Sequence, residues 1–407
     1  MIDPNLSNFY NIILVRYSGE IWLKSPKVRY RMIKTLIKNI KVIFDKEKLT
    51  FTKYQLSKDS TRILFFFNNE DIQKGIDILK RIFGLYSISP ALRTSSNIKN
   101  ISDKTITVAE KILQPEDSFA LRIKRSGNHD FCSQDVGREV GKNIVDHFKN
   151  LNLKVDLTNP KKKIFIEVRG DFTYIFTNII KTDWEGLPIE YDKKIITMDI
   201  GRLGDILGGF LLMRRGCELY PILFDLTNNN DYFERWIDNW KEIFSYVPFF
   251  RFTLKKVNLQ RIFDNFEDKL QEKKYLCGLC RLIRFHVISK ICANLDIKIK
   301  AFSDGVNFNK MSFCNDETDL KSNALSYNFL NLPIFTPLIG LDSEEIHRFL
   351  RKISNNLKTI NYCKYKPQNQ DFNSVRLMDL YNSLKIDEIL ENETIYIEDI
   401  FIKVDKV

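Results

Sequence analysis

Apolar residues near the start of the chain first form a short run and then recur with a helical period. The run Ile12–Val15 predicts a buried strand, and the stretch after it predicts a helix with one buried face. That face is formed by Val28, Met32, Ile33, Leu36, Ile37, Ile40 and Ile43. The opposite face carries Lys34, Lys38 and Lys41. A strand at 63–67 and a helix at 72–83 complete a small αβ unit over residues 1–83.

A second segment, residues 84–183, has shorter apolar periods separated by turn residues. The pattern predicts helices at 106–113 and 133–148, and Ser133 is placed to cap the second of them. It predicts strands at 119–124, 153–157, 164–168 and 173–179. Asn159-Pro160 and Gly170-Asp171 provide the turns between the last three strands.

In the third segment, residues 189–407, strand and helix patterns alternate. The predicted strands are 194–198, 220–224, 249–254, 297–302 and 334–338. The predicted helices are 206–214, 231–244, 276–294, 321–329 and 343–353. This alternation predicts an α/β domain with a parallel sheet covered by helices. Ligands of such sheets bind beyond the carboxyl ends of the strands, so the loop at 199–205 is the expected nucleotide site.

The charge of the chain lies in its first half. The 407 residues carry a formal net charge of +11, and residues 1–188 hold 32 Lys and Arg against 21 Asp and Glu, while the remainder is balanced at 31 against 31. A basic half joined to a neutral half suggests that one part grips a polyanion. The alternative is that these lysines only solvate a surface.

Basic residues of the second segment cluster at predicted loops, where they suit phosphate contacts that give affinity without sequence readout. They are Arg122, Lys124, Arg125, Lys161, Lys162, Lys163 and Arg169. No apolar run is long enough to span a bilayer, and the first residues lack the layout of a signal peptide, so we expect a cytoplasmic protein without a membrane partner. Seven cysteines, an odd number, argue against a disulfide framework and leave thiols for metal or sulfur chemistry.

Six motifs, in a fixed order along the chain, resemble those of the tRNA 4-thiouridine synthetases, also called tRNA sulfurtransferases. They are Arg16-Tyr17-Ser18-Gly19-Glu20-Ile21-Trp22-Leu23-Lys24, Phe83-Gly84-Leu85 with Ser89-Pro90, Gly186-Leu187-Pro188, Met213-Arg214-Arg215-Gly216, Cys277-Gly278-Leu279-Cys280-Arg281 and Pro337–Ile346. The resemblance implies a ferredoxin-like domain at 1–83, a THUMP domain at 84–183 and a PP-loop (adenine nucleotide alpha hydrolase-like) domain at 189–407. The first two would hold tRNA, with Lys24 among the contacts. The third would adenylate a uridine, at position 8 by the resemblance, and replace its 4-oxygen with sulfur.

The phosphate-binding loop departs from the family pattern. The family's Ser-Gly-Gly-x-Asp-Ser aligns with Ile200–Asp205, and of its residues only Gly201 is retained. The resemblance places ATP and its Mg²⁺ at this loop and at a second stretch further on. The corresponding residues are Gly201, Arg202, Gly204, Asp205, Asn309 and Ser312. Two alternatives stay open, namely PP-loop catalysis at a divergent loop and a degenerate loop that keeps only the fold.

Cys277 and Cys280 form a Cys-x-x-Cys at the start of a predicted helix, a pattern also compatible with half a zinc site or with two buried thiols. By the resemblance, Cys363 matches the family's sulfur-handling cysteine, and the trio would hold an iron–sulfur cluster whose open iron binds sulfide. We expect the nearby Lys273, Lys274, Arg281 and Arg284 to lower the thiol pKa values. The other cysteines (Cys132, Cys217, Cys292 and Cys314) and the four histidines are expected to be structural.

Two functions follow from these patterns. The first is an enzyme that thiolates a tRNA uridine with ATP and with inorganic sulfide or another sulfur donor, and a homodimer would let one chain's basic half serve the other's site. The second is a tRNA-binding protein that keeps the fold without ATP turnover. The divergent loop favours the second function and the three cysteines favour the first. A third alternative is delivery of sulfide to a partner that performs the adenylation.

Overall fold

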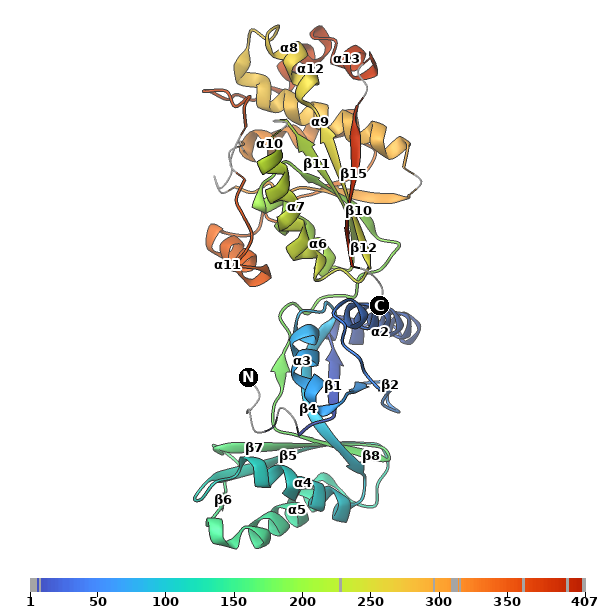
Figure 1. The fold of residues 1–407 in the computed structure, drawn as a ribbon, viewed down its shortest axis with the longest axis vertical. Helices are drawn as coiled ribbons and strands as arrows, with labels where there is room; N and C mark the ends of the chain where they lie inside the picture. Colours follow the sequence, from blue (N-terminus) through green and yellow to red (C-terminus); the bar gives the residue numbers. More distant parts are fainter. Residues whose placement is uncertain are drawn as a thin grey trace. The chain divides into compact units, whose positions relative to one another are not determined.

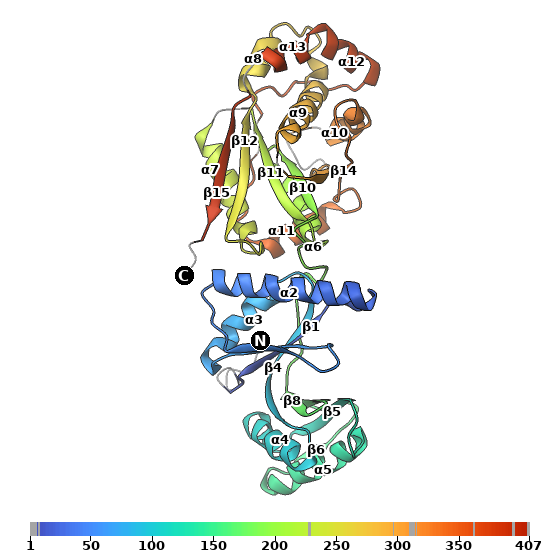
Figure 2. The same ribbon diagram turned by 90° about the vertical axis from the view of Figure 1, so that its right-hand side faces the viewer.

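A computed structural model describes residues 6, 9–226, 229–295, 297–308, 314, 316–360, 363–392 and 395–404. The chain divides into two compact units, which meet in the sequence at Leu187 and Pro188. Figures 1 and 2 show that each unit has its own sheet, covered by helices. The first unit contains the two predicted N-terminal segments, and the second contains the predicted α/β domain.

The sheet of the first unit is built around the long strand β4 (Leu85–Ser95). Its first part pairs with β1 (Ile12–Tyr17), and its last residues, Leu92–Ser95, pair with β8 (Phe172–Phe176). The strand order is β2-β3-β1-β4-β8-β7-β5-β6, with β9 (Ile180–Lys181) also on β4. The outer strands on the β1 side are β2 (Lys53–Leu56) and β3 (Ile63–Phe66). One strand therefore belongs to both halves of this unit.

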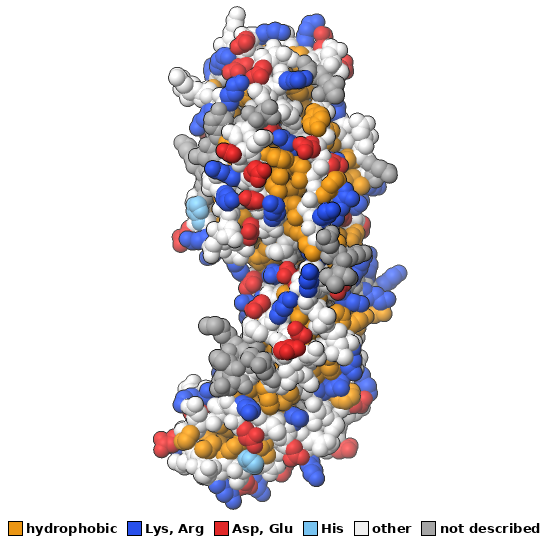
Figure 3. All heavy atoms as spheres, viewed as in Figure 1, with side chains coloured by type: hydrophobic (Ala, Val, Ile, Leu, Met, Phe, Trp, Pro, Cys, Tyr) orange, Lys and Arg blue, Asp and Glu red, His pale blue; other side chains and the backbone are white. Residues whose placement is uncertain are grey.

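Helix α2 (Pro26–Lys46) and helix α3 (Ile72–Lys80) pack on the N-terminal part of this sheet. The predicted apolar face of α2 is buried, because residues such as Met32, Leu36 and Ile40 belong to the main core cluster. Its solvent face carries a regular row of exposed cations, Lys27, Arg31, Lys34, Lys38 and Lys41. Figure 3 shows Lys and Arg side chains where α2 lies in Figure 1. We call these five residues the α2 basic row.

Helices α4 (Ile98–Ile112) and α5 (Ser133–His147) cover one face of the strands β5 (Ser118–Ser126), β6 (Lys154–Val155) and β7 (Lys162–Arg169). The cap of α5 differs by one residue from the prediction. Cys132 is the N-cap, and the carboxylate of Asp135 accepts a hydrogen bond from its backbone N–H (2.8 Å). Ser133 is the first helical residue instead.

The sheet of the second unit has the order β14-β13-β10-β11-β12-β15. The strands are β10 (Lys194–Asp199), β11 (Glu218–Asp225), β12 (Arg251–Asn258), β13 (Ile299–Ser303), β14 (Ile334–Phe335) and β15 (Ile397–Lys403). All neighbouring pairs are parallel except β12 with β15, which is antiparallel. The predicted parallel α/β architecture is confirmed, with an antiparallel edge strand that the prediction did not include.

The helices of this unit are α6 (Leu203–Arg214), α7 (Asn230–Phe244), α8 (Gln260–Glu267), α9 (Leu276–Ala293), α10 (Asp316–Ser322), α11 (Ser343–Ile353), α12 (Ser374–Ser383) and α13 (Ile386–Asn392). Strand β10 has β11 on one side and β13 on the other, so the order of the strands reverses at β10. The carboxyl end of β10 is therefore the switch point at which open α/β sheets bind ligands.

Candidate functional site

The loop at the switch point joins β10 to α6 and packs tightly against the end of β13. A Cβ on Gly204 would lie 2.8 Å from the carbonyl oxygen of Gly305, and one on Gly305 would lie 1.9 Å from the carbonyl carbon of Gly204. Only glycine fits at two backbones this close. Gly201, the retained glycine of the motif, has a φ of +90°, which also favours glycine.

Two amide donors of this loop, those of Ile200 and Gly201, are bound by the chain's own carboxylates. Asp205 accepts hydrogen bonds from the backbone N–H groups of Ile200 (3.2 Å) and Gly305 (2.8 Å). Asp199 accepts one from Gly201 N–H (2.7 Å). A phosphate-binding loop offers such N–H groups to the ligand's anionic oxygens. Here the carboxylate of Asp205 takes the Ile200 amide that such an anion would otherwise bind.

Arg202 stands where the motif has a bare glycine, and its guanidinium is buried. Its Nη2 lies 2.7 Å from Oδ1 of Asp205, and its Nη1 lies 3.0 Å from Oδ2 of Asp319 on α10. The amides of Ile200 and Gly201 are already bonded, and the buried Arg202 side chain fills the motif's glycine position, so the loop in this arrangement does not fit the phosphates of ATP. Asn309 and Ser312, the other predicted nucleotide-binding residues, lie outside the described residues.

Asp319 is the centre of a buried ionic network that the sequence did not reveal. Besides Arg202, it contacts Arg284 (3.3 Å) and Arg281 (4.0 Å), both on α9. Arg281 also pairs with Asp304 at the end of β13. All of these side chains are almost fully buried. The network joins the loop after β10, helix α9 and the end of β13 into one charged cluster.

Asp199, the last residue of β10, is held by two indole groups. The Nε1 atoms of Trp236 and Trp240 on α7 both donate to its Oδ2, the latter at 2.8 Å. Burial, and then the nearby Asp205, raise the pKa of Asp199 to about 7. This side chain therefore anchors α7 to the sheet beside the loop.

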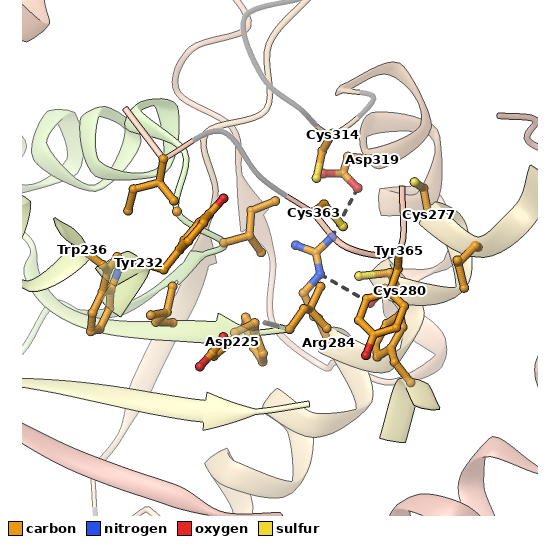
Figure 4. A pocket seen from close by; sticks show the side chains of 18 of the residues that line it. Asp225, Tyr232, Trp236, Cys277, Cys280, Arg284, Cys314, Asp319, Cys363 and Tyr365 are labelled. Atoms are coloured by element: carbon orange, nitrogen blue, oxygen red, sulfur yellow. Dashed lines mark hydrogen bonds and ion pairs between the residues drawn. The ribbon is translucent and has the colours of Figure 1, made fainter. Parts of the chain in front are cut away.

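The three predicted sulfur-handling cysteines come together in one cavity. Cys277 and Cys280 lie in the first turns of α9, and Cys363 lies in a loop that reaches the same space. Figure 4 shows Cys314 beside them, although we expected Cys314 to be structural. The cavity has about 50 Å³ of space for water-sized groups. Its other walls are mainly apolar and aromatic, among them Phe224, Trp236, Phe263, Ile360 and Tyr365.

The prediction that nearby cations lower the thiol pKa values was wrong. Burial raises the pKa of Cys280 to about 11, and it also raises the pKa values of Cys277, Cys314 and Cys363. Arg284 lowers these pKa values, but by less than burial raises them. The two lysines are directed elsewhere, because Lys274 pairs with Asp371 (2.9 Å) and Lys273 with Glu267 (3.5 Å).

Four thiols around one cavity are the donor set that iron–sulfur clusters use. The residues therefore fit such a cluster in their chemistry. Within the described part of the chain, no three His, Cys, Asp or Glu side chains are arranged to hold a metal ion.

The predicted phosphate-contacting cations lie on neighbouring strands of the first unit. Strands β5 and β7 pair in parallel, with Arg122 opposite Phe165. The buried face of β7 is formed by Ile164, Ile166 and Val168. Because side chains alternate along a strand, Arg122, Lys124 and Lys163 share the other face of the sheet. We call these three residues the sheet basic patch.

The remaining candidates differ in how available their charges are. Lys24, Arg125 and Lys161 are exposed and Lys162 is half-buried. Lys161 also pairs with Asp117 (2.6 Å). Arg169 is different, because its guanidinium lies 3.1 Å from both Asp59 and Glu167 and its side chain is only 11% exposed. Its charge is thus largely neutralised by carboxylates of the first unit.

No helix in the described residues is long and apolar enough to cross a membrane.

Family models match three parts of the chain: the ThiI ferredoxin-like domain at 12–89, the THUMP domain at 95–178, and Thiamine biosynthesis protein (ThiI) at 203–370.

Solved structures share the fold. A 4-thiouridine synthetase in complex with RNA and bound ATP aligns with a TM-score of 0.78 and 20% identity, covering 96% of this chain and 100% of that one. PH1313 from Pyrococcus horikoshii aligns with a TM-score of 0.62 and 23% identity, covering 84% and 99% of the two chains.

Among curated proteins, the "Probable tRNA sulfurtransferase" of Methanobrevibacter smithii is 30% identical over 356 residues, covering 84% of this chain and 86% of its own. A protein of the same name from Saccharolobus islandicus is 27% identical over 389 residues, covering 94% and 95%. With motifs, fold and near full-length similarity in agreement, the chain belongs to the tRNA sulfurtransferase family.

Proposed function

We propose that this protein binds tRNA and replaces the 4-oxygen of a uridine, at position 8 by the family resemblance, with sulfur. The observation that carries the proposal is the gathering of Cys277, Cys280 and Cys363 in one cavity beside the loop after β10. The similar solved protein is a 4-thiouridine synthetase complexed with RNA. The test is formation of 4-thiouridine in unmodified tRNA incubated without oxygen with the protein, ATP and sulfide.

In this proposal Cys277, Cys280 and Cys363 would hold an iron–sulfur cluster. A cluster held by three thiolates keeps one iron open, which supplies a position for sulfide. The apolar walls of the cavity would limit access of water to the sulfur. We propose inorganic sulfide as the donor and the cytoplasm as the location, and we propose residues 1–83, 84–183 and 189–407 as the three domains.

ATP is the nucleotide bound by the similar synthetase, and we infer that it reaches this chain's loop only when Asp205 releases the amides of Ile200 and Gly305. A uracil carbonyl oxygen leaves poorly without such activation. Mg²⁺ would accompany the phosphates.

Reopening the loop is therefore expected to strengthen nucleotide binding. The variant Arg202→Gly/Asp205→Ser places the family's residues at both positions and frees the amide donors. We expect it to bind ATP at least tenfold more tightly than the natural protein in calorimetric titration, roughly 1.4 kcal/mol. Arg202→Gly alone leaves Asp205 on the amides and is the matched control. Equal ATP affinity of the double variant and the natural protein, with both folded, would show that the carboxylate does not block the site.

The tRNA surface is proposed to include the sheet basic patch and the α2 basic row. Replacing Lys124 and Lys163 by glutamine is expected to weaken tRNA binding. It should also reduce the slope of log K against log salt by about 0.7 to 0.9 for each lost phosphate contact. The control is Lys298→Gln/Lys300→Gln, two exposed lysines of the second unit. Filter binding at several salt concentrations measures the slope. An unchanged slope would show that the sheet basic patch does not contact tRNA.

A further inference from the structure

Arg284 brings a buried, incompletely paired guanidinium to the thiol cavity. The residue is 1% exposed. Its Nη2 binds Asp319 (3.3 Å), and its Nε lies 3.4 Å from the carbonyl oxygen of Cys280. Its Nη1 is buried and has no hydrogen-bond partner among the described residues. A buried charged donor without an acceptor lowers the stability of the folded protein, so such a group in a native protein calls for an explanation.

The helix places this donor among the thiols. Cys277, Cys280 and Arg284 are spaced three and four residues apart on α9, so they share one face of the helix. Figure 4 shows the guanidinium lying between Cys280 and Cys314, with Cys363 close by. The acidic side chains that line the cavity are already paired, Asp225 with Lys256 (3.2 Å) and Asp319 with its arginines. The acids of the cavity therefore do not use Arg284 Nη1. This group can donate a hydrogen bond to an acceptor that binds in the cavity.

The size and lining of the cavity restrict what that acceptor can be. The cavity has about 50 Å³ of space for water-sized groups, more than the roughly 10 to 15 Å³ that one water needs, so a small anion fits. Apolar walls weaken screening, so a charge-assisted hydrogen bond is stronger here than in water.

We propose that Arg284 is the binding residue for the anionic sulfur that the enzyme consumes, with hydrosulfide as the ligand and Nη1 as its donor. The inference rests on the proposed function, because tRNA thiolation is what would require sulfide in this cavity. Arg284 holds the anion in the cavity that Cys280 and Cys363 also line. Asp319 fixes the guanidinium through Nη2.

Calorimetric titration with sodium hydrosulfide, on protein purified without oxygen, tests the proposal. Arg284→Met keeps an apolar side chain of similar length, and we expect it to weaken hydrosulfide binding at least tenfold. Arg284→Lys keeps the charge and should fall between Arg284→Met and the natural protein. Arg281→Met is the matched control, because Arg281 lies on the same helix, is equally buried and contacts Asp319, but does not line the cavity. Unchanged affinity in folded Arg284→Met would overturn the assignment.

A second measurement needs no variant. Crystals of the natural protein soaked in bromide, a soft monoanion, should show anomalous density within hydrogen-bond distance of Arg284 Nη1. Absence of anomalous density near Arg284 Nη1 at saturating bromide would contradict the proposal, even if Arg284→Met failed to fold.

Kinetics separate this inference from the proposed function. In tRNA thiolation, Arg284→Met should raise KM for sulfide at least tenfold and change kcat much less. If the natural protein makes no thiouridine but hydrosulfide binding still depends on Arg284, the proposed function fails and the anion site stands. If thiouridine forms and hydrosulfide binding does not depend on Arg284, the assignment of the anion site is refuted and the proposed function is retained.

Discussion

Cys363→Ala is expected to abolish thiouridine formation, with a loss of at least a hundredfold, while tRNA binding stays within about twofold of the natural protein. Cys363 is the proposed ligand that reaches the cavity from outside α9, and no other described cysteine of its loop can replace it. The basic surfaces proposed to hold tRNA lie in the first unit, away from this change in the sequence. Absorbance of the modified tRNA and filter binding measure the two properties.

Cys292→Ala is the control for this loss. Cys292 lies on α9 as well, but it lines a different cavity with Ala293 and Phe329. Its removal should leave thiouridine formation nearly unchanged. Full activity of Cys363→Ala would refute the assignment of the sulfur-handling site, and equal losses in both variants would indicate damage to α9 instead.

Asp319→Ala is expected to lower the free energy of unfolding by about 3 to 5 kcal/mol, because it leaves buried guanidinium groups without their shared carboxylate. Asp319 contacts Arg202, Arg281 and Arg284. Asp238→Ala is the control, since that more exposed carboxylate pairs with lysines at the surface. Such pairs contribute about 0 to 1 kcal/mol. Urea unfolding measures both variants, and similar losses would mean that the network contributes little.

The Asp319 carboxylate also makes the free energy of unfolding depend on pH. Burial raises the pKa of Asp319, but the three arginines outweigh it and hold the pKa below its ordinary value of 3.8. A carboxylate with a lowered folded pKa stabilises the protein above the unfolded pKa, and this stability is lost as the pH falls through the folded value. We therefore expect the unfolding free energy to fall below about pH 4, with a shallower fall in Asp319→Asn.

Much of the fold could be predicted from the chain because apolar periodicity reports which faces are buried. The helical period of α2 and the alternation of strands and helices from β10 onward are examples. Strand β4 was missed because Pro90 within it is typical of a turn, and here it lies opposite Ile13 on β1. Strand β15 was missed because its exposed edge position gives it few buried residues.

The site was predictable only where its residues lie close in the sequence. The Cys-x-x-Cys and Arg284 follow helical spacing, so their common face could be foreseen. The filled loop could not, because the Asp205 carboxylate that accepts from the Ile200 amide also meets the Gly305 amide, 100 residues away. Cys314 likewise joins the thiols only through tertiary packing. Contacts between residues far apart in the sequence thus shape the phosphate loop, and no local motif predicts them.

Labelled sulfide tests whether the thiol cavity transfers sulfur to a tRNA uridine. Protein purified without oxygen is incubated with unmodified tRNA, ATP and radioactive sulfide, and the nucleosides of the recovered tRNA are separated. We expect label in 4-thiouridine with the natural protein and none with Cys363→Ala. Protein that binds tRNA tightly but leaves every uridine unlabelled would contradict this expectation and would favour a tRNA-binding role without turnover.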